Sequence, residues 1–161
     1  RRRSRPPNGR HVPAAPSRAS LIAPAEKYQA RIQRDNFGVP HISGPTDRDV
    51  AFGFGFAHSE DDFATIQEVV LTSRGQLASV KGSEGAPADY LVRLFKIHDT
   101  VASQYDKVLP AETRAVLEAY ADGINYYGGL HPDKDLAGIL PVTGRDIAEG
   151  LVFRWSFFYG L

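Results

Sequence analysis

The pattern of apolar and polar positions changes sharply after residue 25. Residues 1–25 hold five of the eleven prolines and six arginines, and no hydrophobic period runs through them. A segment of this kind lacks the apolar surface that would offset the entropy of ordering it. We therefore predict a flexible or surface-draped basic arm over residues 1–25 and a folded domain over residues 26–161.

An alternating pattern after the arm predicts a β-hairpin. Tyr28, Ala30 and Ile32 alternate with polar residues, which is the period of a half-buried strand. Residues 35–38 read Asp-Asn-Phe-Gly, a typical turn sequence. Residues 39–42 then return in extended form, because a residue that precedes proline is disfavoured in a helix.

Apolar residues at helical spacing predict four helices after the hairpin. The first and last begin behind Thr46 and Thr143, whose hydroxyl oxygens can cap a helix N-terminus. The predicted spans are 49–73 with a break near 59–62, 89–108 as one helix, a helix that starts at Pro110, and a last helix from about residue 144. The fold class is thus α+β, mostly helical with an N-terminal strand or hairpin.

The last predicted helix is apolar on nearly every side. Its stripe consists of Ile147, Leu151, Trp155, Phe158 and Tyr159. An independent domain seldom ends on a helix of this kind, because the apolar surface needs a cover. We therefore expect a second chain to pack on it.

Composition narrows the classes of function. The formal net charge is zero, which gives no general reason to expect a nucleic acid or a membrane surface as a partner. Cysteine is absent, so disulfides, thiolate nucleophiles and cysteine-ligated metal sites are excluded. Methionine is absent even at position 1, so we expect a processed N-terminus from which any signal peptide has been removed.

No self-sufficient active site is visible. Ser59 stands beside His58 and near Asp61, but neighbours on a helix point in different directions, so a catalytic triad is not expected there. His58, Asp61 and Asp62 share one helical face and offer a metal-binding alternative. We favour a polar helix face or an acid that holds backbone donors, and thus no metal.

Three further features favour structural interpretations. His41 and His98 stand among apolar residues, which favours core histidines over ligands. The run Phe-Gly-Phe-Gly-Phe at 52–56 lacks the third glycine and the acid of a dinucleotide-binding loop. Its glycines favour close packing of a helix against neighbouring backbone.

Three segments, in order, resemble the penicillin acylase family. Residues 34–42 read RDNFGVPHI, residues 49–62 read DVAFGFGFAHSEDD, and residues 73–78 read SRGQLA. The family's small subunit opens with R-D-x-x-G-V-P-H-I, then G-x-G-Y-x-x-A-Q-D-R, then R-G-x-L-A-E. Only Asp61 of the Gln-Asp-Arg triplet is kept here. The acidic version at 60–62 is similar to the acyl-homoserine lactone acylase and aculeacin acylase branch.

The resemblance implies the smaller subunit of a heterodimeric amide hydrolase. Such a precursor cuts itself, and the new N-terminal residue of the larger β-subunit, usually serine, is the nucleophile. The two chains together form a four-layer αββα Ntn-hydrolase fold. Catalytic residues are thus expected on the partner, with an N-acyl compound such as an acyl-homoserine lactone or a β-lactam as substrate.

The resemblance also implies a role for the last helix as a wall of the acyl pocket. The positions that match are Trp155, Phe158 and Tyr159, with Phe157 as a further candidate. No cofactor is required, although some members hold a structural calcium, and the expected location is periplasmic or secreted. The alternative is a non-catalytic helical interaction module that docks a partner through its aromatic C-terminus.

Overall fold

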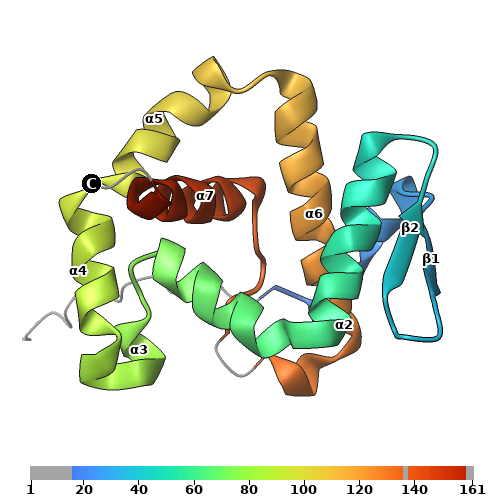
Figure 1. The fold of residues 1–161 in the computed structure, drawn as a ribbon, viewed down its shortest axis with the longest axis horizontal. Coiled ribbons are helices and arrows are strands. Elements are labelled where there is room, and N and C mark those ends of the chain that lie inside the picture. The colour runs from blue at the N-terminus through green and yellow to red at the C-terminus, as the bar shows by residue number, and fades with distance from the viewer. Residues whose placement is uncertain (1–15, 136–137, 159–161) are drawn as a thin grey trace, which may run out of the picture.

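The computed structural model describes the backbone of residues 16–135 and 138–158, with side chains up to Trp155. Most of it is helical, with a single two-stranded sheet among the described residues, so the predicted α+β class is confirmed (Figure 1). The elements, with η for a 3-10 helix, are α1 (Arg18–Ile22), η1 (Ala23–Lys27), β1 (Arg31–Arg34), β2 (Pro40–Ser43), α2 (Asp47–Ser73), α3 (Ala78–Lys81), η2 (Gly82–Glu84), α4 (Ala86–Leu94), α5 (Ile97–Val108), α6 (Ala111–Leu130), η3 (Pro132–Lys134) and α7 (Gly144–Phe158).

The second half of the predicted arm has regular structure. Ser17 caps α1 by accepting the backbone N–H of Ser20 at 3.2 Å, and η1 follows directly. Leu21 is buried, and α1 packs against α6 beside Gly129. Residues 18–25 of the predicted flexible or surface-draped arm thus lie on α6, where a single buried leucine anchors them without any hydrophobic period. Residues 1–15 lie outside the described residues.

The hairpin is confirmed. Strands β1 and β2 pair antiparallel, with Ile32 opposite Ile42. Both isoleucine side chains reach the backbone of α2 at Gly53, where a Cβ atom would lie 2.8 Å from Ile42 Cγ2. The hairpin thus lies on the first half of α2 through its apolar face.

Helix α2 is bent at the predicted position. Asp62 has φ −153° and ψ 65°, which are not helical values, and its carboxylate accepts the backbone N–H of Thr65 at 3.1 Å. Asp62 therefore ends one helical segment and caps the next. The bend turns the second half of α2 toward α7 (Figure 1).

The single helix predicted over 89–108 is wrong, because the structure has α4 and α5 there instead. Lys96 lies between them with φ +51°, a left-handed conformation that interrupts the helix. Val101 and Tyr105 are buried, whereas Leu94 and Phe95 are exposed. The apolar spacing runs unbroken through the junction, so the pattern did not reveal the turn.

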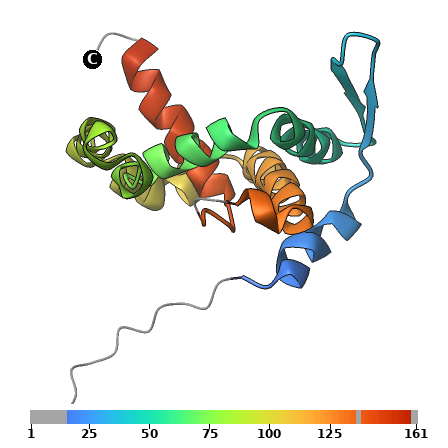
Figure 2. The same cartoon turned by 90° about the horizontal axis from the view of Figure 1, so that it is seen from below.

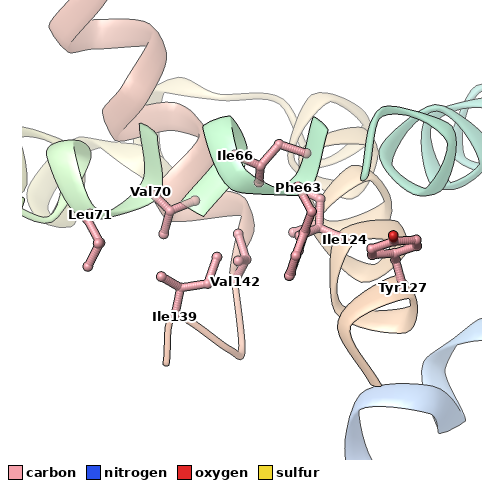
Figure 3. Packing of buried hydrophobic residues seen from close by; sticks show 9 residues of the cluster. Phe63, Ile66, Val70, Leu71, Ile124, Tyr127, Ile139 and Val142 are labelled. Atoms are coloured by element: carbon pink, nitrogen blue, oxygen red, sulfur yellow. The ribbon is translucent and has the colours of Figure 1, made fainter. Parts of the chain in front are cut away.

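The main hydrophobic core lies between the second half of α2, helix α6 and the segment before α7. Figure 3 shows these side chains converging from the three parts of the chain. The buried members are Phe63, Ile66, Val70, Leu71, Ala121, Ile124, Tyr127, Ile139 and Val142. No helix in the described part of the chain combines the length and apolarity that a membrane span needs.

Candidate functional site

The first two of the three sequence motifs meet at Arg34. Its guanidinium donates to the Gly38 carbonyl at 2.8 Å and forms ion pairs with Asp61 at 2.8 Å and Glu60 at 3.1 Å. The hydrogen bonds that Arg34 donates to Asp61 and Glu60 raise the pKa of its guanidinium above the ordinary value. Asp61 therefore joins the hairpin to helix α2, and its role is structural.

A second carboxylate joins the chain before the hairpin to the start of α2. Asp49 is 6% exposed and accepts the backbone N–H of Gln29 at 2.7 Å and of Thr46 at 3.0 Å. The Thr46 hydroxyl donates to the same carboxylate and accepts the Asp49 N–H, which completes a capping box. The hydrogen bond from the Thr46 hydroxyl, followed by the one from Gln29, lowers the pKa of Asp49.

The third motif fixes the start of α7. Arg74 pairs with Asp146 in a fork, Nε to Oδ1 at 2.6 Å and Nη2 to Oδ2 at 3.0 Å. The same guanidinium donates to the carbonyls of Ile139 at 2.8 Å and Pro141 at 2.9 Å. Arg74 thus holds both the helix start and the chain that leads to it.

Asp146 also caps α7 together with Thr143. Its carboxylate accepts the backbone N–H and the hydroxyl of Thr143, both at 2.8 Å, as the sequence predicted for this helix start. Burial acts to raise the pKa of Asp146, but the Arg74 charge and these hydrogen bonds outweigh it and keep the pKa below its ordinary value. Asp146 is therefore held ionised in the folded chain.

The residues considered for a catalytic triad or a metal site each form a hydrogen bond or an ion pair with a different partner. Ser59 is fully buried and donates to the Gly55 carbonyl at 2.8 Å, while His58 Nδ1 lies 2.6 Å from the Tyr120 hydroxyl. Asp61 binds Arg34 and Asp62 caps a helix segment, as described above. Among the described residues no three histidine or acidic side chains are arranged to hold a metal ion. The polar-face interpretation fits these contacts.

The predicted burial of two histidines is wrong. The side chains of His41 and His98 are 66% and 75% exposed, and they lie 3.3 Å from Asp35 and 2.8 Å from Glu149. Apolar neighbours in the sequence do not tell which face of an element a histidine occupies. The buried partner in the second pair is Glu149, whose pKa is raised by burial although His98 opposes the shift.

A groove of about 360 Å³ lies between the second half of α2, helix α6 and helix α7. Its walls are mostly apolar, with the His58–Tyr120 pair, Asp146 and Arg154 as polar members. Burial raises the pKa of Tyr120, so its hydroxyl stays protonated in this setting. The apolar lining comes from Ile66, Val69, Val70, Ile124, Ile147 and Leu151. Such a groove can cover an apolar group, and it offers no nucleophile paired with a base.

The groove was missed in the sequence because its walls come from three helices. The only sequence feature that points to the groove is the spacing of Ile147, Leu151 and Arg154 along one side of α7. Nothing in the sequence distinguishes Arg154 from an ordinary surface arginine. A larger hollow of about 550 Å³ lies next to Asp49, but residues that join the hairpin segment to α2 form it. The groove is the candidate site because it adjoins the predicted acyl-pocket helix.

Residues 29–156 match the sequence model of the penicillin amidase family. The chain belongs to this family. The three motifs that suggested it therefore build a frame in this penicillin amidase chain: Arg34, Asp49 and Arg74 each join elements far apart in sequence. Their contacts place α7 relative to α2 and the hairpin.

Known relatives of this penicillin amidase chain include two kinds of acylase. It is 31% identical over 112 residues to penicillin acylase 2 proenzyme of a Pseudomonas species, a match that covers 70% of this chain and 14% of the relative. It is 32% identical over 108 residues to the acyl-homoserine lactone acylase QuiP of Pseudomonas putida, covering 67% of this chain and 13% of the relative. The chain thus spans about one seventh of the length of these relatives.

A solved structure supports the fold. The thermostable penicillin G acylase from Alcaligenes faecalis superposes with a TM-score of 0.63 at 21% identity, over 81% of this chain and 74% of that chain. The family predicted from the sequence motifs is confirmed.

The predicted acyl-pocket residues lie at the end of α7. Trp155 is 61% exposed, and Leu151 and Val152 on the same helix are exposed as well. Phe157 and Phe158 belong to the backbone of α7. The side chains of Phe157 and Phe158, and Tyr159 as a whole, lie outside the described residues, so their part in an acyl pocket stays a prediction.

Proposed function

We propose that this chain is the small subunit of a heterodimeric N-acyl amide hydrolase, an acyl-homoserine lactone or β-lactam acylase. The observation that carries the proposal is the family match over residues 29–156, together with relatives about seven times longer than the segment they share with this chain. One relative is described as a proenzyme, which supports a precursor that is cut into chains. The larger chain would complete the four-layer αββα fold.

In the proposed mechanism the nucleophile is the N-terminal serine of the larger chain. Its own α-amino group accepts the hydroxyl proton as the oxygen attacks the amide carbonyl. Oriented hydrogen-bond donors on the larger chain stabilise the oxyanion, and the proton leaves with the amine. Water then hydrolyses the acyl-enzyme ester and releases the acid.

The contribution of this chain is scaffold and acyl-pocket wall. An acyl chain has no hydrogen-bonding group, so a site binds it only by burying apolar surface, at about 25 cal/mol per Å². Trp155, Phe157, Phe158 and Tyr159 offer such surface on α7. The Arg74–Asp146 fork supports this role, because it fixes the helix start that sets where these rings lie.

A serine-directed sulfonyl fluoride tests the proposal. The protein, purified from the full-length gene product, is treated with the reagent and analysed by mass spectrometry. We expect a second, larger chain that carries the label on its N-terminal residue, together with loss of release of the amine from an N-acyl substrate. A small chain found alone and monomeric, or a label on the small chain, contradicts the proposal and favours the interaction module.

Two further parts of the proposal concern ions and location. We propose that hydrolysis needs no cofactor, so dialysis against EDTA should leave its rate unchanged. A lower melting temperature after the same treatment would reveal a structural calcium, whose ligands the described residues of this chain do not assemble. A periplasmic or secreted location stays a prediction from the family, and cell fractionation tests it.

A further inference from the structure

The most exposed large apolar side chain of the described residues is Phe37, at the tip of the hairpin. Its exposed fraction is 93%. Figure 2 shows the hairpin projecting from the helices, so the tip is remote from the core of this chain. Isolated exposed apolar residues are ordinary, and further observations are needed to give this ring a role.

The turn that carries Phe37 is held rigid. Asp35 accepts the backbone N–H groups of Phe37 and Val39 on one carboxylate oxygen, both at 2.9 Å. The backbones of Asp35 and Val39 bond at 3.1 Å, and Gly38 donates to the Asp35 carbonyl at 3.0 Å from a left-handed conformation with φ +83°. Arg34 donates to the Gly38 carbonyl from the other side. The side chain is thus presented on a fixed backbone.

Rigidity matters because binding costs conformational entropy. A ring on a fixed turn loses little freedom when it enters a pocket, so more of the burial energy remains as affinity. Large aromatic side chains presented in this way are common among the residues that dominate interfaces. The construction of the turn therefore favours an anchoring role for Phe37.

Further exposed apolar side chains follow the tip in sequence and lie on the first half of α2. Val39, Val50 and Phe54 are 52%, 36% and 53% exposed. A shallow hollow of about 380 Å³ lies beside them, lined by Pro40, Ile42, Val50, Ala51, Phe54, Val116 and the acidic Asp47. Exposed apolar side chains beside a hollow are typical of an interaction site. We call the tip and the hollow together the hairpin face.

We propose that the hairpin face is a docking surface for the larger acylase chain and that Phe37 inserts into an apolar pocket on it. The inference rests on the proposed function and names the surface used. The occupant follows from length, because the relatives are about seven times longer than their match to this chain. A two-stranded hairpin is also marginally stable in isolation, and it gains from a cover on its exposed side.

Photo-crosslinking tests the contact directly. The photoreactive p-benzoylphenylalanine replaces Phe37 in the full-length precursor, and the processed protein is irradiated. We expect an adduct whose mass is the sum of both chains. If both chains are present and position 37 reacts only with a second small chain, with residues 1–15 or with nothing, the inference is wrong while the proposed function stands. If no larger chain is present, the proposed function itself fails.

Matched variants test the energetic role. Phe37→Ala removes the ring and leaves every hydrogen bond of the turn, since all of them use the backbone, Asp35 or Arg34. We expect the two chains of the processed protein to associate about tenfold more weakly, which graded urea followed by size-exclusion chromatography would detect. Phe37→Tyr keeps the ring and should retain association.

Tyr90 provides the control position. It is 64% exposed on α4, at the opposite end of the molecule from the hairpin (Figure 1). Tyr90→Ala should leave association unchanged. Equal weakening by Phe37→Ala and Tyr90→Ala, or no weakening by Phe37→Ala, overturns the anchoring role.

Discussion

At the scale of single residues, carboxylates organise the turns and helix starts of this chain. Asp49, Asp89 and Asp146 each accept backbone N–H groups and are buried or nearly so. Asp89 receives the N–H groups of Leu77 and Ala78 at 2.7 and 3.0 Å, which positions the third family motif. A buried carboxylate persists only when hydrogen bonds or a cation compensate its lost hydration. Each of these acids should therefore be intolerant of change.

Replacing Asp146 by asparagine should destabilise the fold. The change leaves Arg74 without its charged partner at a mostly buried position, which costs about 3 kcal/mol. The folded-state pKa of Asp146 is lowered, so its stabilisation is full above the ordinary value of 3.8 and is lost as the pH falls through the folded value. Urea unfolding at pH 7 and pH 3 measures the effect.

The difference in free energy of unfolding between Asp146→Asn and the parent chain should thus be smaller at pH 3 than at pH 7. Asp133 is exposed on η3 and provides the matched control, since Asp133→Asn should change the free energy of unfolding by less than about 0.5 kcal/mol. A deficit for Asp146→Asn that is the same at both pH values would contradict the ion-pair explanation.

Glu149 should show the opposite pH dependence. Burial raises its pKa, so the folded chain binds a proton more tightly than the unfolded chain does. The contribution of Glu149 to the free energy of unfolding is therefore full below its ordinary pKa of 4.5. It declines as the pH rises through the pKa of the folded state. Glu149→Gln removes the charge and keeps the size of the side chain. Relative to the parent, we expect the variant to gain stability between pH 4 and pH 7.

Denaturant unfolding of Glu149→Gln at pH 4 and pH 7 measures that gain. His98 faces the carboxylate from α5, and Asp146 and Arg74 are the other charged groups that act on it. His98→Ala removes the nearby cation, so the pKa of Glu149 should rise further and the decline toward pH 7 should steepen. If the free energies of unfolding of the parent and of Glu149→Gln change in parallel with pH, the raised pKa of Glu149 does not explain the pH dependence.

At the scale of elements, the closest contact is the crossing of α2 and α6. A Cβ atom on Gly55 would collide with the carbonyl oxygen of Tyr120, and one on Gly123 with the carbonyl oxygen of Phe52. Backbone cannot move aside as a side chain does. The predicted close packing against neighbouring backbone is therefore confirmed for Gly55, whereas Gly53 packs against the side chains of Ile42 and Ala30.

Alanine at position 123 should separate these helices. Alanine is favoured over glycine inside a helix by about 1 kcal/mol, so stabilisation is the expectation from propensity alone. The collision with α2 reverses the sign, and we expect a net loss of about 2 kcal/mol for Gly123→Ala from overpacking. Thermal unfolding measures it.

Gly150 on α7 is the matched control. The nearest atoms to its Cβ position lie at 3.9 and 4.0 Å, which is ordinary contact. Gly150→Ala should therefore raise the stability by about 0.5–1 kcal/mol. If Gly123→Ala is stabilised as Gly150→Ala is, the close contact between α2 and α6 at Gly123 is wrong.

The elements that could be predicted from sequence are those with local causes. The Asp35–Gly38 turn, the caps at Thr46 and Thr143 and the bend at Asp62 each depend on residues within a few positions of one another. The separation of α4 from α5 could not be predicted in this way. Lys96 adopts its left-handed conformation without a glycine to signal it, and only tertiary packing decides where the two helices point.

The candidate groove, too, could be predicted from the sequence only in part. Leu151 was assigned to an apolar stripe of the last helix, and it does lie in the groove wall. The facing walls on α2 and α6 come from residues some 30 to 90 positions away, such as Ile124 and Ile66, and no spacing in the sequence relates them to α7. The exposure of His41 and His98 depends on the same long-range packing.

At the scale of the whole molecule, the fold is a frame with exposed apolar side chains in several places, two of which bear on docking. One is the hairpin face and the other is α7, where Leu151 and Trp155 are 51% and 61% exposed. The three family motifs build the frame between these surfaces, and their residues Arg34, Asp49 and Arg74 each hold separate parts of the chain together. This distribution suits a subunit that positions a helix against a partner.

The proposed acyl-pocket role of α7 predicts a change in selectivity when its rings are made smaller. Trp155→Ala or Tyr159→Ala enlarges the pocket, so longer acyl chains should gain relative to shorter ones. Each additional buried methylene contributes about 0.8 kcal/mol, a factor of about four in kcat/KM. Hydrolysis of N-acyl-homoserine lactones of graded chain length by the processed two-chain protein measures the profile, with Val80→Ala on the exposed surface of α3 as control. The rate of the chemical step for the best substrate should change less than the ratio between chain lengths does. A profile unchanged in both ring variants would show that α7 packs against the larger chain without touching the acyl group.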